Sequence, residues 1–271
     1  MKDKDYKAFI VEGEAREPQI IDNISKIFFS HKNYTVITLP AGENIYMLWM
    51  QLKEDGFDTD IIEVLRERND EIRKQLTGLS RDDFSEVYLF FDYDVHQTNL
   101  GKTVNEDVIH QMLESFDNET ENGKLYISYP MVEALRDYES GKCGNGENCF
   151  VGIEELGNYK NTSAARAHNP HFKEYGIDDW KDIINVFAMR VSCLYDMPGM
   201  MEYEQYSDVV TPIKIYAMEV KNAEMQQVFV LSAFPEFLLD YFGMKLWKTS
   251  VKYRKNQKNS LNCVIRGGLH I

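Results

Sequence analysis

Short apolar runs alternate with helix-like segments through the first half of this chain. Branched and aromatic residues make up residues 9–11 and 87–91, and similar runs occupy residues 34–39 and 124–128. Such runs are typical of buried strands. Between them, apolar residues at three- and four-residue spacings predict helices over residues 18–29, 45–52 and 60–76. This alternation predicts an α/β fold with a mostly parallel sheet and right-handed crossovers.

Acidic residues stand at the ends of two of these runs. Glu12 follows the first run directly, and Asp92 and Asp94 follow residues 87–91. Ligands of open α/β sheets bind beyond the carboxyl ends of strands, so the three carboxylates meet if the two strands are neighbours. Asp92 and Asp94 then face one cation such as Mg²⁺, and Glu12 positions or deprotonates a nucleophile or is a further ligand of the ion. The alternative is that these acids are helix caps and turn formers.

A third acidic residue follows the run at residues 124–128. Pro130 is expected to end that strand and open a helix, which leaves Glu133 in the first helical turn. Glu133 is then either part of the site or a residue that the helix dipole stabilises. His96, close to the aspartates, either has a role at the site, in binding substrate phosphate or in proton transfer, or is an ordinary surface histidine.

Taken together, these motifs resemble the Toprim signature and, more closely, the RloB-like and OLD-type anti-phage proteins. The family pattern is Glu-Gly-Glu-x-x-Glu-Pro, then Asp-x-Asp with a nearby His, then Ser-x-Pro-x-x-Glu. It is met here, over roughly residues 7–140, by Glu12, Glu17 and Pro18, by Asp92, Asp94 and His96, and by Ser128, Pro130 and Glu133. Two positions depart from it: Arg16 stands where Thr is usual, and Tyr129 where Asn is usual.

The resemblance implies a Rossmann-like Toprim core that cleaves or rejoins nucleic-acid phosphodiesters with a metal. By that likeness Glu12 is the general acid or base, and Asp92 and Asp94 are ligands of Mg²⁺, with Mn²⁺ as a substitute. Glu133 completes the site, with Glu17, His96 and Ser128 as further residues around it. A role in anti-phage defence through abortive infection, with a possible partner subunit, rests on the resemblance alone.

The charge distribution bears on a nucleic-acid partner. The net charge of −14 opposes attraction to phosphates. From residue 243 onward, however, the chain has no Asp or Glu, and Trp247 and Tyr253 alternate with basic residues. These are Lys245, Lys248, Lys252, Arg254, Lys255, Lys258 and Arg266. The mixture is typical of a surface that binds phosphates and stacks on bases, and equally of a solvated tail.

Four cysteines, Cys143, Cys149, Cys193 and Cys263, are too few and too scattered for a disulfide framework, so reduced thiols are expected. A zinc site from Cys143, Cys149, His168 and His171 is disfavoured, because its spacing differs from that of zinc fingers. The alternative is a flexible loop with unrelated histidines.

The second half of the chain is expected to be a separate extension. Residues 1–140 are predicted to form the Toprim-like core, and residues 141–271 a loop-rich, helical extension with a basic tail. Apolar spacing predicts helices near residues 178–194 and 218–242, where Pro235 starts or kinks a helix that Gly243 ends. Without a bilayer-length apolar stretch or a signal peptide, we expect a cytoplasmic protein that does not bind membranes; it can form homo-oligomers.

The sequence therefore predicts a magnesium-dependent nuclease acting on DNA or RNA. A first alternative is a non-catalytic Toprim-like sensor or regulatory subunit, which the acidity favours because basic protein partners would be attracted. A second alternative is a nucleotide phosphohydrolase, because the same carboxylates can act on a small phosphate.

Overall fold

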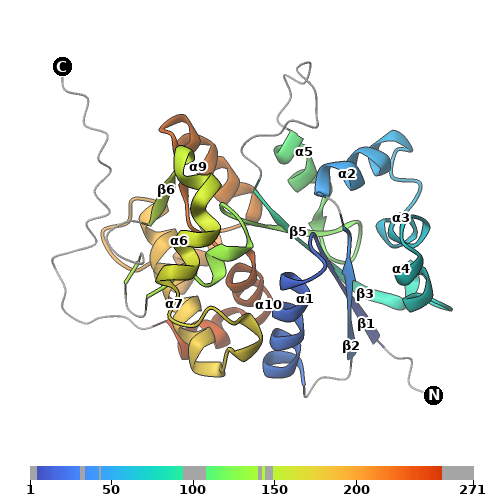
Figure 1. The fold of residues 1–271 in the computed structure, drawn as a ribbon, viewed down its shortest axis with the longest axis horizontal. Coiled ribbons are helices and arrows are strands. Elements are labelled where there is room, and N and C mark those ends of the chain that lie inside the picture. Colours follow the sequence, from blue (N-terminus) through green and yellow to red (C-terminus); the bar gives the residue numbers. More distant parts are fainter. Residues whose placement is uncertain are drawn as a thin grey trace. The chain divides into compact units, whose positions relative to one another are not determined.

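The chain forms two compact units in a computed structural model that describes residues 5–30, 34–42, 44–93, 108–139, 142–143 and 149–251 (Figure 1). The N-terminal unit contains the described residues up to Asp92 together with residues 108–126. The C-terminal unit contains Tyr93 and the described residues from Ile127 onward. Residues 127–139, which the sequence grouped with the core, cluster with the second unit.

A five-stranded sheet organises the N-terminal unit, with β5 continuing into the first residues of the C-terminal unit. Its strand order is β2-β1-β3-β5-β4. Strand β1 pairs in parallel with both β2 and β3, and β4 runs antiparallel to β5. The strands are β1 (Asp5–Val11), β2 (Tyr34–Pro40), β3 (Phe84–Asp92), β4 (Asp117–Asn118) and β5 (Gly123–Ser128). The predicted α/β class with a mostly parallel sheet is confirmed.

Helices connect these strands in the order that the sequence indicated. They are α1 (Arg16–Ile24), which continues as a π-helix (Ser25–Phe29), then α2 (Ile45–Glu54), α3 (Ile61–Arg68), α4 (Asp70–Gln75) and α5 (Val108–Ser115). Figure 1 shows α1 on one side of the sheet and α3 and α4 on the other, as right-handed crossovers from β1 to β2 and back from β2 to β3 require.

The single helix expected over residues 60–76 is wrong in one respect, because Asn69 divides it into α3 and α4. Asn69 has an extended backbone (φ −130°, ψ 116°). Its side-chain oxygen accepts hydrogen bonds from the backbone N–H groups of Glu71 (2.8 Å) and Ile72 (3.2 Å). Asparagine is a favoured N-cap residue. Here Asn69 caps α4, and α3 ends before this residue although the apolar spacing continues.

The core of the N-terminal unit is centred on β1. Ala8, Phe9, Ile10 and Val11 are all fully buried, as expected for a parallel strand covered on both faces. The Phe9 ring makes edge and tilted contacts with surrounding aromatic rings, with centroids 5.4–6.0 Å apart. Those rings belong to Phe29, Tyr88 and Phe90.

The C-terminal unit is mainly helical, as predicted, and contains a small antiparallel sheet that was not predicted. Its α-helices are α6 (Tyr159–Arg166), α7 (Ile177–Leu194), α8 (Tyr203–Val209), α9 (Pro212–Glu224) and α10 (Ala233–Ser250), and its 3₁₀ helices include η3 (Val132–Leu135), η4 (Ile153–Asn158) and η5 (Phe172–Glu174). Strand β6 (Phe150–Gly152) pairs with β7 (Gln227–Phe229). Residues 218–242, predicted to be helical, are therefore interrupted by β7, because Val228 and Phe229 find strand partners in β6.

A buried arginine joins three segments of this unit. The Arg190 guanidinium, on α7, donates to the backbone carbonyl oxygens of Cys143 (2.5 Å), Val230 (2.9 Å) and Asp137. The carboxylate of Asp137 accepts from the Tyr159 hydroxyl (2.9 Å) and pairs with Arg166 (2.6 Å). Burial lowers the pKa of Arg190, and the nearby Asp137 carboxylate opposes this shift. The network holds the segments around residues 137, 143 and 230 against α7.

Helix α10 changes direction at Gly243. It begins with Ser232 as N-cap, with Pro235 in its first turn, and is interrupted where Gly243 adopts φ 58° and ψ −145°. The predicted break at Gly243 is confirmed. A Cβ atom at this position would lie 3.1 Å from the Tyr203 hydroxyl oxygen. Among the helices that the structure describes, none has the combined length and apolarity that a bilayer-spanning helix needs.

We expect Gly243→Ala to lower the free energy of unfolding by about 1–2 kcal/mol, because an L-residue is strained at positive φ. The matched control is Gly157→Ala in the same unit, where an added Cβ meets nothing within 4 Å. Urea denaturation of both variants measures the difference. Equal stability of Gly243→Ala and wild type would contradict the assigned backbone conformation.

Candidate functional site

Glu12 and Asp92 meet where β1 and β3 end. The backbone N–H of Glu12 donates to the carbonyl oxygen of Phe90 (3.2 Å), which extends the parallel ladder by one residue. The Glu12 carboxylate, through Oε2, accepts a hydrogen bond from the backbone N–H of Asp92 (3.1 Å). Both residues are half-buried. The two strands are neighbours, as the sequence analysis required, and Glu12 reaches the end of β3.

The backbone of Glu12 is also held from the β2 side. Its carbonyl oxygen accepts from the N–H of Gly42 (3.1 Å), and the preceding residue, Val11, accepts from Ala41 (2.7 Å). Hydrogen bonds from both flanking segments therefore fix the direction in which the Glu12 side chain leaves the sheet. A side chain so positioned needs little reorganisation to act on a ligand.

Gly13 allows the Glu17 carboxylate to approach the backbone of the loop that follows β1. Its N–H donates to Oε1 of Glu17 (3.2 Å), in the first turn of α1. A Cβ atom on residue 13 would lie 2.8 Å from Oε2 of Glu17, so a larger residue here would displace the end of the Glu17 side chain. Glu17 is buried, and the first turn of a helix stabilises its negative charge. It supports the loop that carries Glu12.

Asp94 and His96 lie outside the described residues, so their expected roles stay predictions. Glu12 and Asp92 both offer carboxylate oxygens, the hard donors that Mg²⁺ prefers. Mg²⁺ is usually bound by one or two carboxylates, with waters and substrate phosphates completing its coordination. The donor chemistry at these strand ends fits that ion.

Ser128 and Glu133 belong to the C-terminal unit. The Ser128 hydroxyl is buried and accepts from the backbone N–H of Ala233 (3.3 Å), at the start of α10. A cis Tyr129–Pro130 peptide follows, and η3 then places the fully buried Glu133 in its first turn. The helix expected after Pro130 is present as a short 3₁₀ helix. The catalytic role of Glu133 and the substrate-contact role of Ser128 stay predictions.

A buried carboxyl group that the sequence analysis missed lies on α9. Glu219 is fully buried, and its Oε2 accepts from the backbone N–H of Phe229 (3.0 Å). No described residue supplies a hydrogen bond to its Oε1. Burial raises the pKa of Glu219 well above its ordinary range. The signal was present in the sequence, because Glu219 repeats with the buried residues Ile215 and Asn222 at helical spacing.

The proposed basic surface is only partly described. Lys245 and Lys248 are exposed on α10. Trp247 is 1% exposed and packs against Tyr206, with ring centroids 4.8 Å apart. The expectation that Trp247 stacks on bases is therefore wrong, because the tryptophan fills the core between α8 and α10. The other predicted contacts lie outside the described residues: Lys252, Arg254, Lys255 and Lys258.

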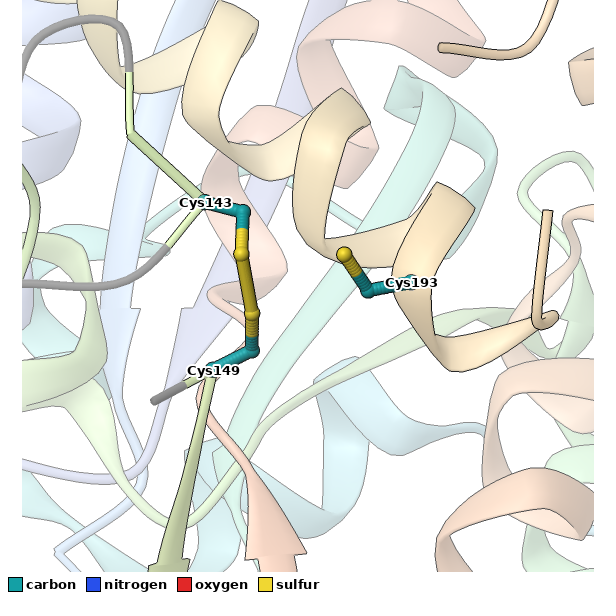
Figure 2. Close-up of side chains that lie close together, drawn as sticks. All are labelled: Cys143, Cys149 and Cys193. Atoms are coloured by element: carbon teal, nitrogen blue, oxygen red, sulfur yellow. A yellow bond between two sulfur atoms is a disulfide. The ribbon is translucent and has the colours of Figure 1, made fainter. Parts of the chain in front are cut away.

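The oxidation state of two cysteines differs from the expectation. Cys143 and Cys149 form a disulfide, with Cα atoms 5.9 Å apart, so the expected reduced state is wrong for this pair (Figure 2). The disfavoured zinc set with His168 and His171 is not assembled among the described residues. The group that could hold a metal consists instead of Cys143, Cys149 and Cys193.

Comparisons of the chain with protein-family models, curated proteins and solved structures found no match. The interpretation of the strand-end carboxylates therefore rests on their own geometry and on the sequence motifs.

We expect Glu12→Ala to be less stable than Glu12→Gln by about 1 kcal/mol, because only the glutamine amide oxygen can still accept from Asp92 N–H. Both variants lack the Glu12 charge, so their comparison isolates the hydrogen bond. Urea denaturation gives the two free energies of unfolding. Identical values would mean that the Glu12–Asp92 bond does not form in solution.

Glu219 predicts a pH-dependent stability. Because the folded protein keeps this carboxyl group protonated above its ordinary pKa, the unfolded chain releases the proton first as pH rises. Wild type should therefore lose stability relative to Glu219→Gln above about pH 4.5, by up to about 1.4 kcal/mol per pH unit until the folded group ionises. Urea denaturation at pH 5, 6.5 and 8 measures this difference in the free energy of unfolding between wild type and Glu219→Gln. Glu224→Gln, exposed on the same helix, is the control; a gap that is constant with pH would disprove the buried neutral state.

Proposed function

We propose that this protein is a magnesium-dependent nuclease of the Toprim type. The observation that carries the proposal is the position of Glu12, whose carboxylate accepts from Asp92 N–H at the adjoining ends of two parallel strands. This is the edge at which α/β sheets bind ligands. The sequence motifs around Glu12 and Asp92 support the Toprim assignment, and their RloB-like order supports a role as an effector in anti-phage defence.

In the proposed reaction, water attacks a phosphodiester phosphorus and one ester oxygen leaves. Glu12 accepts the proton of the attacking water, which suits a carboxylate held rigidly at its backbone and hydrogen-bonded through one oxygen. Asp92, with Asp94, would hold Mg²⁺. When bound, this ion neutralises negative charge on the phosphate oxygens.

The acidity of the chain supports a metal-dependent mode of substrate binding. A net charge of −14 repels a polyanion, and carboxylates at the site add to this repulsion. A divalent ion reverses the local charge. The exposed Lys245 and Lys248 belong to the basic segment proposed to attract nucleic acid.

Cleavage assays test the proposal. Purified protein is incubated with labelled DNA, tRNA and nucleotides in the presence of Mg²⁺, Mn²⁺ or chelator. We expect metal-dependent cleavage of a nucleic acid, and a loss of about 10²-fold or more in Glu12→Gln, because a general base typically contributes 10²–10⁴-fold. Asp92→Asn should lose both cleavage and calorimetric Mg²⁺ binding.

The matched controls are Glu67→Gln and Asp82→Asn, which remove exposed carboxylates of the same unit and should keep full activity. Wild-type activity in both Glu12→Gln and Asp92→Asn would overturn the proposal. Hydrolysis of nucleotides alone would indicate a phosphohydrolase instead. Absence of both cleavage and Mg²⁺ binding in wild type would indicate a non-catalytic sensor.

A further inference from the structure

Three cysteines gather in the C-terminal unit, at a place that the proposed nuclease reaction does not use. Their sulfur atoms all lie within 4.8 Å of one another. Cys143 and Cys149 are joined in a disulfide, and Figure 2 shows Cys193 projecting from α7 with its sulfur directed toward that bond. We propose that, when the disulfide is reduced, Cys143, Cys149 and Cys193 bind a thiophilic divalent cation, with Zn²⁺ as the representative ion.

The spacing of the sulfur atoms suits such an ion. Zn–S bonds of about 2.3 Å in tetrahedral geometry place thiolate sulfurs about 3.8 Å apart. After reduction the two formerly bonded sulfurs must separate, whereas sulfurs up to 4.8 Å apart must approach by about 1 Å; small side-chain rotations supply both movements.

The cysteine backbones are anchored independently of the disulfide. The carbonyl oxygen of Cys143 accepts from Arg190 on α7 (2.5 Å), and that of Cys149 accepts from the backbone N–H of Val230 (2.8 Å). Cys193 lies in the last turn of α7. Reduction breaks the S–S bond and leaves these hydrogen bonds in place, so the three thiols stay together.

A buried cation lies close to the cluster. Three thiolates and one Zn²⁺ carry a net charge of −1. The buried Arg190 cation interacts electrostatically with Cys193, three residues along the same helix. It offsets this charge in surroundings where an uncompensated charge would be costly.

The ligand set leaves one position open. Cys149 is fully buried and Cys193 is 6% exposed, whereas Cys143 is half-buried. Solvent therefore reaches the cluster from the Cys143 side, where a water or a small anion can complete tetrahedral coordination.

Metal binding at this site follows reduction of the disulfide. Two thiols of a reductant give two electrons and two protons to the Cys143–Cys149 bond; the protein gains two thiols and the reductant becomes a disulfide. Zinc then displaces the protons of three cysteine thiols, so its binding releases up to three protons per ion.

Metal titration of the full chain tests the site. Protein is reduced with dithiothreitol, freed of it without air, and titrated with Zn²⁺ against a chromophoric chelator, and with Co²⁺ to detect thiolate-to-metal absorption. Reduced wild type should bind one ion per chain at this site, and oxidised wild type none. Cys193→Ser should weaken binding by about 100-fold or more, since loss of an outer-shell partner alone costs 10–100-fold.

Cys263→Ser is the matched control, because it removes a thiol outside the described part of the chain, and it should bind like wild type. Cys143→Ser, at the half-buried position, should weaken zinc binding as Cys193→Ser does. It replaces Cys193→Ser in the experiment if Cys193→Ser does not fold. Absence of zinc uptake by the reduced wild type would overturn the site. So would equal affinity in Cys193→Ser and Cys263→Ser.

Discussion

The position of β1 between two parallel partners is the constraint on which the N-terminal unit depends. Its last four residues are fully buried, and the register pairs Val11 with both Pro40 and Phe90. Because both faces are covered, a shift by one residue would break the ladder hydrogen bonds and misplace every packed ring around Phe9. The same register determines where the strand ends, and hence that Glu12 donates to Phe90 and reaches Asp92. The candidate site is thus a direct consequence of core packing.

Much of this unit could be predicted from the sequence, because its strands are apolar and β-branched and the connections between them have a helical period. The break at Asn69 could not be predicted from period alone, since one capping side chain outweighs the apolar pattern. In the C-terminal unit, Val228 and Phe229 lie in a continuous apolar segment. Whether such a segment is helix or strand depends on a partner 77 residues away, as the pairing of Val151 with Val228 shows.

The candidate site, too, could be predicted only in part from the sequence. Acidic residues after apolar runs indicated Glu12 and Asp92, because the rule for strand ends depends only on local sequence and strand direction. The order of the strands made them neighbours, and no local pattern encodes that order. Trp247 illustrates the reverse error: its basic neighbours suggested a nucleic-acid surface, yet Tyr203 and Tyr206 on α8 bury its ring. The cysteine cluster was missed because Cys193 comes from a helix distant in sequence from Cys143 and Cys149.

The two proposed metal sites would select different ions through ligand chemistry alone. Carboxylate oxygens at the ends of β1 and β3 are hard donors that suit Mg²⁺, whereas the thiolates of Cys143, Cys149 and Cys193 would suit zinc and other soft cations. Their charge environments also differ. Glu12 and Asp92 are half-buried, so solvent and phosphate oxygens can complete the coordination of a labile ion, and the Glu12 carboxylate accepts from the Asp92 backbone N–H. At the proposed thiolate site, the buried Arg190 interacts electrostatically with Cys193 and would offset part of the negative charge. Since reduction controls only the sulfur donors, loss of the soft ion by disulfide formation would leave the oxygen ligands of the proposed catalytic ion unchanged.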